Sequence, residues 1–252
     1  MTEELIGLIP AAGKGLRLRL PYPKELYPII RDNRYKPVSQ FVVENLIASG
    51  VNHIVFVINE TKHQLIGFFG DGHRFGCNFS YVVQENREDE SQSTSPGLGH
   101  ALNSAYHLIK GKTVCFGMAD TLMVPGDVFR QVLIQSKMDD EVILAVFTSD
   151  HPEKGAKVCM EKDGRVTKIV DKPKEIDHRH TWGCIIWRPA FTEFLNEQIS
   201  SGVSDFADVM NHAIQKGMRF RGVYLSEGIY SDLGTYEEIV ELEKKHGSLR
   251  QL

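Results

Sequence analysis

Two glycines follow the first apolar run of the chain, in a segment whose residue types suit phosphate binding. Leu5–Pro10 is apolar, and residues 11–17 read AAGKGLR. Glycines let a backbone approach a ligand closely and direct its N–H groups at an anion, and Lys14 and Arg17 add positive charge. The segment is not a P-loop, which needs Ser or Thr after Gly-Lys, and it lacks the third glycine of the dinucleotide fingerprint. A tight turn with two solvated cations explains it equally well, so the segment alone leaves phosphate binding open.

A lysine among prolines follows a few residues later. Residues 21–29 read PYPKELYPI, and the prolines on both sides restrict the directions in which Lys24 can point. The two pieces together, G-x-G-x-R and then P-K-x-L-x-P-I, form a more specific pattern than either alone.

Two aspartates are candidate metal ligands. Asp120 ends the run FGMAD after a predicted strand, and ligands of open α/β sheets bind at the carboxyl ends of strands. Asp232 lies in YSDLGT, just before the last predicted helix. Two carboxylates with phosphate oxygens and waters suit octahedral Mg²⁺. On the residues alone, a turn or cap residue is the more common interpretation of each aspartate.

In this order, the motifs resemble those of the sugar-1-phosphate nucleotidyltransferases, which include the glucose-1-phosphate thymidylyltransferases and uridylyltransferases. The resemblance spans most of the chain. It implies an enzyme that transfers a nucleotidyl group from a nucleoside triphosphate, dTTP or UTP, to a sugar 1-phosphate, forming an NDP-sugar and releasing pyrophosphate. It also implies Mg²⁺ as cofactor, held by Asp120 and Asp232. The Lys24-Glu25 pair looks like the uridylyltransferases, whereas the length looks like the short thymidylyltransferases.

The resemblance assigns roles on the nucleotide side. Arg17 matches an arginine that holds phosphate oxygens, and Lys24 matches a lysine at the reacting centre. Gln84 matches a glutamine that reads the pyrimidine edge. The residues that it implies around the triphosphate and base are Ala12, Gly13, Lys14, Gly15, Gln84, Gly97 and Leu98. Leu16 stands where the family usually has threonine, and the polar stretch 85–96 is long, so the base stays open.

The acceptor side departs further from the family. Gly155 matches a glycine near the sugar, and Lys172 matches the catalytic lysine that contacts the sugar phosphate. Asp171 replaces the usual glutamate that holds sugar hydroxyls, which shortens the reach. Trp182 and Gly183 match a segment beside the sugar, where tryptophan is unexpected and could stack on a ring or belong to the core.

Apolar runs alternate with helical patterns along the chain, which predicts an α/β fold. We expect a Rossmann-like three-layer nucleotidyltransferase fold with a mixed, mostly parallel central sheet. The Asp163-Gly164 pair predicts a hairpin between strands at 156–161 and 166–170. A helix is expected over 97–109, and others over 38–49, 61–69, 125–136, 189–199, 205–216 and 235–245. One domain is expected over 1–252, with a nucleotide half to about residue 150 and an acceptor half beyond it.

Composition limits the classes of protein that remain. A net charge of −4 argues against a nucleic-acid binder. No apolar stretch reaches the ~20 residues of a membrane helix. The acidic start does not resemble a signal peptide, and the four cysteines make no CxxC pair, so we expect a cytoplasmic protein. Members of the family are often dimers or tetramers, which leaves a homo-oligomer open.

Two other functions stay open. A cytidylyltransferase that activates a non-sugar phosphate or phosphonate would fit the departures at Asp171 and Trp182. A non-catalytic nucleotide-binding regulatory protein would not need both metal aspartates. A glycosyltransferase is disfavoured, because the expected Asp-x-Asp is absent where Asp120-Thr121-Leu122 stands.

Overall fold

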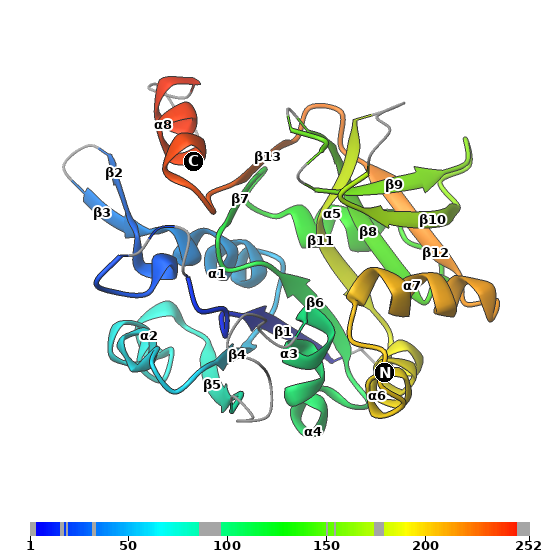
Figure 1. The fold of residues 1–252 in the computed structure, drawn as a ribbon, viewed down its shortest axis with the longest axis horizontal. Helices are drawn as coiled ribbons and strands as arrows, with labels where there is room; N and C mark the ends of the chain where they lie inside the picture. Colours follow the sequence, from blue (N-terminus) through cyan, green and yellow to red (C-terminus); the bar gives the residue numbers. More distant parts are fainter. Residues whose placement is uncertain are drawn as a thin grey trace.

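A nine-stranded mixed sheet forms the centre of the computed structural model (Figure 1). The structure describes residues 4–15, 18, 20–31, 34–85, 97–149, 151–153, 155–173 and 179–245. The strands of the sheet are β1 (Leu5–Pro10), β4 (His53–Ile58), β5 (Asn78–Val83), β6 (Thr113–Gly117), β8 (Val142–Thr148), β9 (Ala156–Met160), β10 (Val166–Asp171), β11 (His180–Trp187) and β12 (Phe220–Tyr224).

The strand order is β5-β4-β1-β6-β11-β8-β12. The first four strands are parallel to one another, and β12 is parallel to β8. β11 runs antiparallel to both β6 and β8. The predicted hairpin of β9 and β10 joins β11 through Thr181, which pairs with Lys157. The mixed, mostly parallel sheet predicted from the apolar runs is therefore confirmed.

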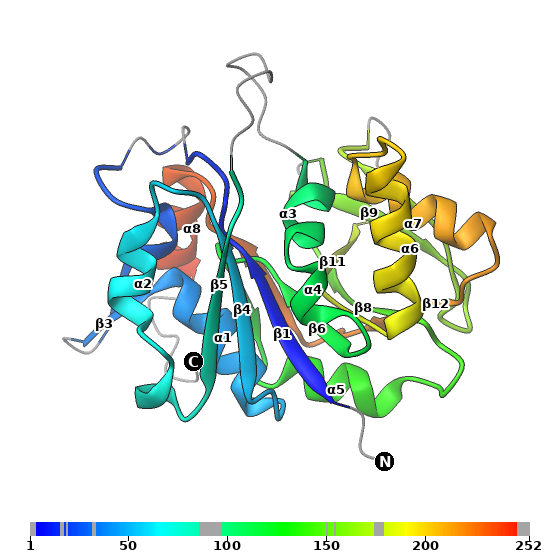
Figure 2. The ribbon, with the colours of Figure 1, turned by 90° about the horizontal axis from the view of Figure 1, so that it is seen from below.

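Helices cover both faces of the sheet, which explains why its central strands are apolar throughout. α1 (Val38–Ala48), α2 (His63–Phe69) and α5 (Val128–Gln135) pack on one face. α3 (Leu98–Ser104), α4 (Tyr106–Ile109), α6 (Pro189–Ser200) and α7 (Phe206–Gln215) pack on the other (Figure 2). Successive side chains of a strand point to opposite faces. Leu8 belongs to the apolar core under α3, α4, α6 and α7, and Ile9 to the core under α1, α2 and α5.

Short elements lie beyond the carboxyl ends of the parallel strands. β7 (Thr121–Val124) pairs antiparallel with β13 (Ile229–Asp232), and β2 (Pro28–Arg31) pairs with β3 (Arg34–Pro37). One 3₁₀ turn, η2 (His73–Phe75), lies elsewhere, between α2 and the start of β5. The 3₁₀ turn η1 (Lys24–Leu26) precedes β2. α8 (Tyr236–Lys245) follows β13 (Figure 1). A third apolar cluster joins them, comprising Leu18, Ile29, Val38, Leu122, Leu233 and Ile239.

The predicted helices are present, with two differences. The helix expected over 97–109 is broken into α3 and α4 at Ala105, whose N–H donates to Leu102 in a tighter i→i+3 bond. The helix expected over 125–136 begins at Val128, after Gly126 and the N-cap Asp127. In the part of the chain that the structure describes, no helix combines the length and apolarity needed to cross a bilayer.

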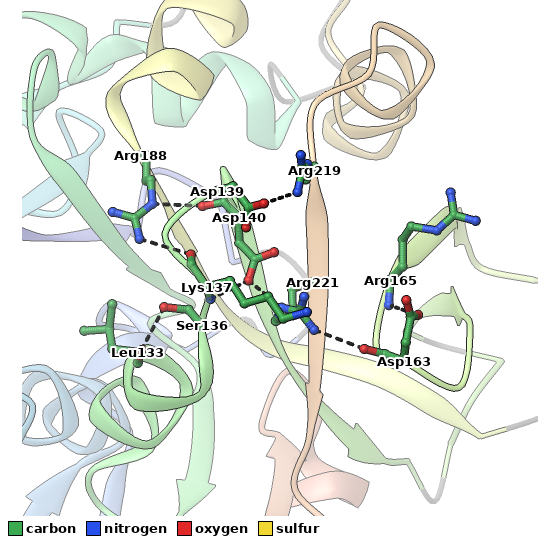
Figure 3. Close-up of polar contacts among 10 residues, drawn as sticks. All are labelled: Leu133, Ser136, Lys137, Asp139, Asp140, Asp163, Arg165, Arg188, Arg219 and Arg221. Atoms are coloured by element: carbon green, nitrogen blue, oxygen red, sulfur yellow. Dashed lines mark hydrogen bonds and ion pairs between the residues drawn. The ribbon is translucent and has the colours of Figure 1, made fainter.

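A polar network lies at the amino ends of β8 and β12, at the end of the sheet opposite to the short elements (Figure 3). The buried carboxylate of Asp140 accepts hydrogen bonds from the Arg221 side chain and from the Lys137 N–H, the latter over 2.7 Å. Arg221 also donates to the Asp163 carbonyl over 3.0 Å, and Arg188 donates to the Asp140 carbonyl over 2.8 Å. The network ties the loop after α5 to β11, β12 and the β9–β10 turn.

Candidate active site

A cavity of about 170 Å³ opens at the carboxyl ends of β1, β5 and β6. β1 has β4 on one side and β6 on the other, and the chain fills the β4 side before it reaches β6. In open α/β sheets, such a reversal of strand order places the ligand crevice at this edge. The residues that line the cavity are Pro10, Ala11, Ala12, Gly13, Lys24, Glu25, Gln84, Leu98, Ala101, Met118, Ala119 and Asp120.

The glycine segment leaves β1 along the end of β4. The N–H of Ala11 donates to the carbonyl of Val57 over 2.7 Å, which extends the parallel pairing by one residue. Gly13 and Gly15 have no neighbour within 4 Å of the point where a β-carbon would stand. Gly15 has φ +64°, in the left-handed region that favours glycine. The segment therefore presents open backbone beside the cavity; its Lys14 is exposed, and the predicted Arg17 lies outside the described residues.

Lys24 and Asp120 form an ion pair at this cavity. Lys24 projects from η1 and donates to Asp120, which follows β6; their side chains are 17% and 9% exposed. Burial alone would lower the pKa of Lys24, but the charge and hydrogen bond of Asp120, with the charges of Glu25 and Asp232, raise it. Lys24 is thus a cation at neutral pH, and it lines the cavity.

Asp232 lies close to this pair although 112 residues separate it from Asp120 along the chain. β13 brings it there, because Asp232 pairs with Thr121 in the β7–β13 ladder, and the N–H of Leu233 donates to the Asp120 carbonyl over 2.9 Å. Burial, and then the charges of Asp232 and Asp120, raise the pKa of the Tyr230 phenol. Two segments predicted separately from the sequence therefore meet at one point.

The chemistry of these donors fits a hard divalent cation. Both side chains are carboxylates, the oxygen donors that Mg²⁺ prefers, and the single Lys24 ammonium compensates only part of their charge. Among the described residues, no group of three or more His, Cys, Asp or Glu side chains is arranged as a metal site. A cation at Asp120 and Asp232 would accordingly complete its coordination with substrate oxygens and water.

The residues predicted around the base are only partly brought to the cavity. Gln84 and Leu98 line it, and the Gln84 N–H donates to the Ile58 carbonyl over 2.7 Å, so Gln84 continues the edge pairing of β5. Gly97 caps α3 and faces away from the lining, since a β-carbon there would lie 2.7 Å from the Ser204 carbonyl oxygen. Close packing of α3 thus explains the glycine.

The predicted acceptor residues form a second group beside the cavity, outside its lining. Asp171 pairs with Ala156, next to Gly155, at the start of β9. The exposed Lys172 side chain places its Nζ 3.5 Å from Asp171 Oδ2. The backbone of Lys172 has φ 43°, a strained conformation for a residue with a β-carbon. The sheet register places these residues in one row with the beginning of β11, beyond the end of β6.

Trp182 and Gly183 occupy that beginning of β11, at a β-bulge. The centre of the Trp182 ring lies 5.8 Å from that of the Phe116 ring, and its buried indole N–H has no hydrogen-bond partner among the described residues. A β-carbon on Gly183 would lie 2.6 Å from Phe147 and 2.9 Å from Tyr230, so the glycine lets β13 cross closely over the sheet. Trp182 is therefore partly a core residue that still presents an unsatisfied donor.

Sequence reasoning did not assign roles to two buried polar residues behind the cavity. Asn59 follows β4 and its amide donates to the Ala12 carbonyl over 2.8 Å. Lys62, at the start of α2, pairs with Glu25 over 2.6 Å. The position of Asn59 at a strand end was a usable signal. The pairing of Lys62 with a residue 37 positions earlier leaves no local pattern.

Known proteins with similar sequences include named nucleotidyltransferases. A family model described as nucleotidyl transferase matches residues 6–248. A low-salt glycan biosynthesis nucleotidyltransferase of Haloferax volcanii is 24% identical over 243 residues, 93% of this chain and 64% of that protein. A glucose-1-phosphate thymidylyltransferase of Streptomyces antibioticus is 23% identical over 247 residues, 94% of this chain and 65% of that protein. The chain thus spans just under two thirds of the length of these relatives.

The fold has close solved counterparts. The crystal structure of a UDP-glucose pyrophosphorylase complexed with UDP-glucose superposes with a TM-score of 0.78 at 24% identity, covering 96% of this chain and 98% of that one. The sheet and its two helix layers define a Rossmann-like three-layer fold. The match to the family model is more specific: the chain belongs to the nucleotidyl transferase family.

Proposed function

We propose that this protein transfers a nucleotidyl group from a nucleoside triphosphate to a sugar 1-phosphate, releasing pyrophosphate and forming an NDP-sugar. The observation that carries the proposal is the Lys24–Asp120 pair with Asp232 beside it, next to an open glycine backbone at the cavity. Family membership and the named activities of the relatives support it. The proposed donor is dTTP or UTP, since one relative is named a thymidylyltransferase and one solved structure a UDP-glucose pyrophosphorylase.

The chain's own residues would act by placement and charge neutralisation, as in other phosphoryl transfers. An oxygen of the sugar phosphate forms a bond to the α-phosphorus, while the bond from that phosphorus to the bridging oxygen breaks and pyrophosphate leaves with its electron pair. The open N–H groups near Gly13 and Gly15, with Arg17, would hold the leaving pyrophosphate. Lys24 would bind the reacting phosphate, and Lys172 the acceptor phosphate. No covalent enzyme intermediate is required.

Asp120 and Asp232 would hold Mg²⁺. When bound, the cation would neutralise charge on the phosphate oxygens and orient them. The Lys24 ammonium donates to Asp120. A bound triphosphate would offer Lys24 other anionic partners and would leave the Asp120 carboxylate available to the cation.

The acceptor side is where the alternatives lie. Gly155, Asp171, Trp182 and Gly183 would surround the sugar, and the buried indole N–H of Trp182 is a donor that a bound acceptor could satisfy. The same indole face would suit the quaternary ammonium of phosphocholine. A cytidylyltransferase acting on such a non-sugar phosphate is therefore the second candidate.

Pyrophosphate release tests these candidates directly. The chain would be incubated with Mg²⁺, one of dTTP, UTP, CTP, ATP or GTP, and a sugar 1-phosphate, phosphocholine or a small phosphonate. Release with dTTP or UTP and a sugar 1-phosphate is the expected result. Release with CTP and a non-sugar acceptor alone would favour the second candidate. Tight nucleotide binding without release under every pairing would indicate a non-catalytic regulatory protein.

We propose a cytoplasmic location for this activity. The free thiols Cys77, Cys115, Cys159 and Cys184 are consistent with a reducing compartment. Self-association stays a prediction, which light scattering of the purified chain would test.

A further inference from the structure

Four side chains of alternating charge run from α2 to the end of β6, and only two of them are explained by binding substrate. They are Lys62, Glu25, Lys24 and Asp120, joined as the ion pairs Lys62–Glu25 and Lys24–Asp120. Lys62 and Glu25 are 4% and 1% exposed. Among the described residues, Glu25 Oε2 is buried without a hydrogen-bond partner, and Lys62 donates to Oε1 of the same carboxylate. A buried ion pair of this kind is weak evidence for stability, which points to a positional role.

Glu25 shares one 3₁₀ turn with Lys24, and the turn is held from two sides. The Ser39 hydroxyl donates to the Glu25 carbonyl over 2.7 Å, which fixes the backbone. Lys62 fixes the Glu25 side chain. Because Lys24 precedes Glu25 directly, restraining Glu25 restrains the backbone from which Lys24 reaches Asp120.

Asn59, three residues before Lys62, holds the glycine segment after β1, here called the glycine loop. The N–H and hydroxyl of Thr61 both donate to Asn59 Oδ1, over 2.9 and 2.7 Å. The Asn59 amide must therefore present its Nδ2 to the Ala12 carbonyl oxygen, 2.8 Å away. The N–H of Lys62 donates to the Asn59 carbonyl over 3.1 Å, which joins the two holding residues in one turn. Ala12 and Glu25 line the cavity that Asn59 and Lys62 support from behind.

We propose that Asn59 and Lys62 are positioning residues, and we call the turn that holds them the brace. The brace fixes the glycine loop relative to Lys24, so that both ends of a bound triphosphate are positioned correctly at once. The proposal rests on the proposed function and adds to it two residues outside the cavity lining. It assigns them separable tasks: Asn59 acts on the loop that receives the leaving phosphates, and Lys62 acts on the lysine at the reacting phosphate.

The test compares each residue with a matched exposed one. Asn59→Ala is paired with Asn78→Ala, whose exposed amide donates to the Asn52 carbonyl over 3.4 Å. Lys62→Met is paired with Lys112→Met, whose lysine forms a surface pair with Glu4 over 2.6 Å. Methionine keeps the apolar stem of lysine and removes its charge. If Asn59→Ala or Lys62→Met does not fold, Asn59→Asp and Lys62→Gln replace them, since they conserve shape.

The expected result is a split between the two kinetic constants. Asn59→Ala raises KM for the triphosphate by about tenfold with kcat nearly unchanged, as for the loss of roughly one hydrogen bond from binding. Lys62→Met lowers kcat by about 100-fold, the loss typical of a slight misplacement at a reacting centre. Kinetic constants equal to those of the controls would overturn the proposal. Equal falls in kcat in both variants with KM for the triphosphate unchanged, as expected when part of the enzyme is simply unfolded, would also overturn it.

A failure of the proposed function would be recognised separately, because wild-type protein would then form no NDP-sugar. Hydrogen exchange would still test the brace. The amides to follow are Ala11, bonded to Val57, and Leu26 and Tyr27, bonded within η1. Ala11 should exchange faster in Asn59→Ala, and Leu26 and Tyr27 faster in Lys62→Met, than in the controls. Unchanged exchange at these amides would refute the brace independently of any activity.

Discussion

The Asp140–Arg221 ion pair lies at the amino ends of β8 and β12, away from the cavity (Figure 3). Its burial allows its contribution to the free energy of unfolding to be predicted. The Asp140 side chain is 3% exposed, and Arg221 and the Lys137 N–H both donate to it. Arg221→Met keeps the apolar stem of the arginine and leaves the carboxylate buried without its counter-charge. Breaking a buried pair from one side costs about 3–5 kcal/mol. We expect about 3 kcal/mol, near the lower limit, because the Lys137 N–H remains a donor.

Arg219→Met, in the residue just before β12, is the matched control. Arg219 pairs with Asp139, and the two side chains are 64% and 51% exposed. Water screens this pair, so its loss should cost less than about 1 kcal/mol. For a chain of this size, the two predictions correspond to falls in melting temperature of about 6–12 °C and less than about 4 °C.

Urea unfolding followed by circular dichroism measures both free energies. Arg221→Met should lower the transition midpoint with an unchanged slope, since the surface exposed on unfolding stays the same. Because the network lies far from the cavity, nucleotide binding below the transition should equal that of wild type. Equal midpoints for Arg221→Met and Arg219→Met would refute the assignment of the stabilisation to the buried pair.

Two further predictions concern packing and titration. Gly183→Ala would place a β-carbon 2.6 Å from Phe147 and should lower the unfolding free energy by about 1–3 kcal/mol, whereas Gly67→Ala, with open space around it, should not; urea midpoints decide this. Burial, and then repulsion by Asp71, raise the pKa of Tyr81 to about 12. Above pH 10 the unfolded phenol loses its proton while the folded one keeps it, so Tyr81 makes the unfolding free energy fall as pH rises from 10 towards 12. Tyr81→Phe should flatten that fall, and an unchanged slope would count against the pKa shift.

The central strands could be predicted because their positions follow from burial. β1 and β4 begin and end where the apolar runs do, since both faces of these strands are covered. β7 and β13 were not predicted, although β13 carries Asp232. Each has four residues, and each is extended because it pairs with a strand more than 100 residues away. Such pairing leaves no local periodicity.

The residues at the candidate site also differ in how far the sequence could predict them. Motif spacing identified Lys24 and Asp120, and the structure places both at one cavity. That Lys24 contacts Asp120 directly, and that Glu25 turns away from it to Lys62, depends on how η1 packs against α1 and α2. Asn59 and Lys62 carry no motif, because their partners lie in distant segments. The roles carried over to Arg17, Lys172 and the acceptor residues stay predictions.

Product formation by Asp120→Asn tests the central claim most directly. Wild type, Asp120→Asn and the exposed control Asp139→Asn would each be given Mg²⁺, the preferred triphosphate and its acceptor, and NDP-sugar would be quantified by chromatography. We predict that Asp120→Asn still folds, with a melting temperature lowered by the loss of the Lys24 ion pair. It should form product at least about 100-fold more slowly, the loss typical of removing a charge-stabilising group. The control should match wild type. Product formation by a folded Asp120→Asn at the wild-type rate would contradict the assignment of this cavity as the active site.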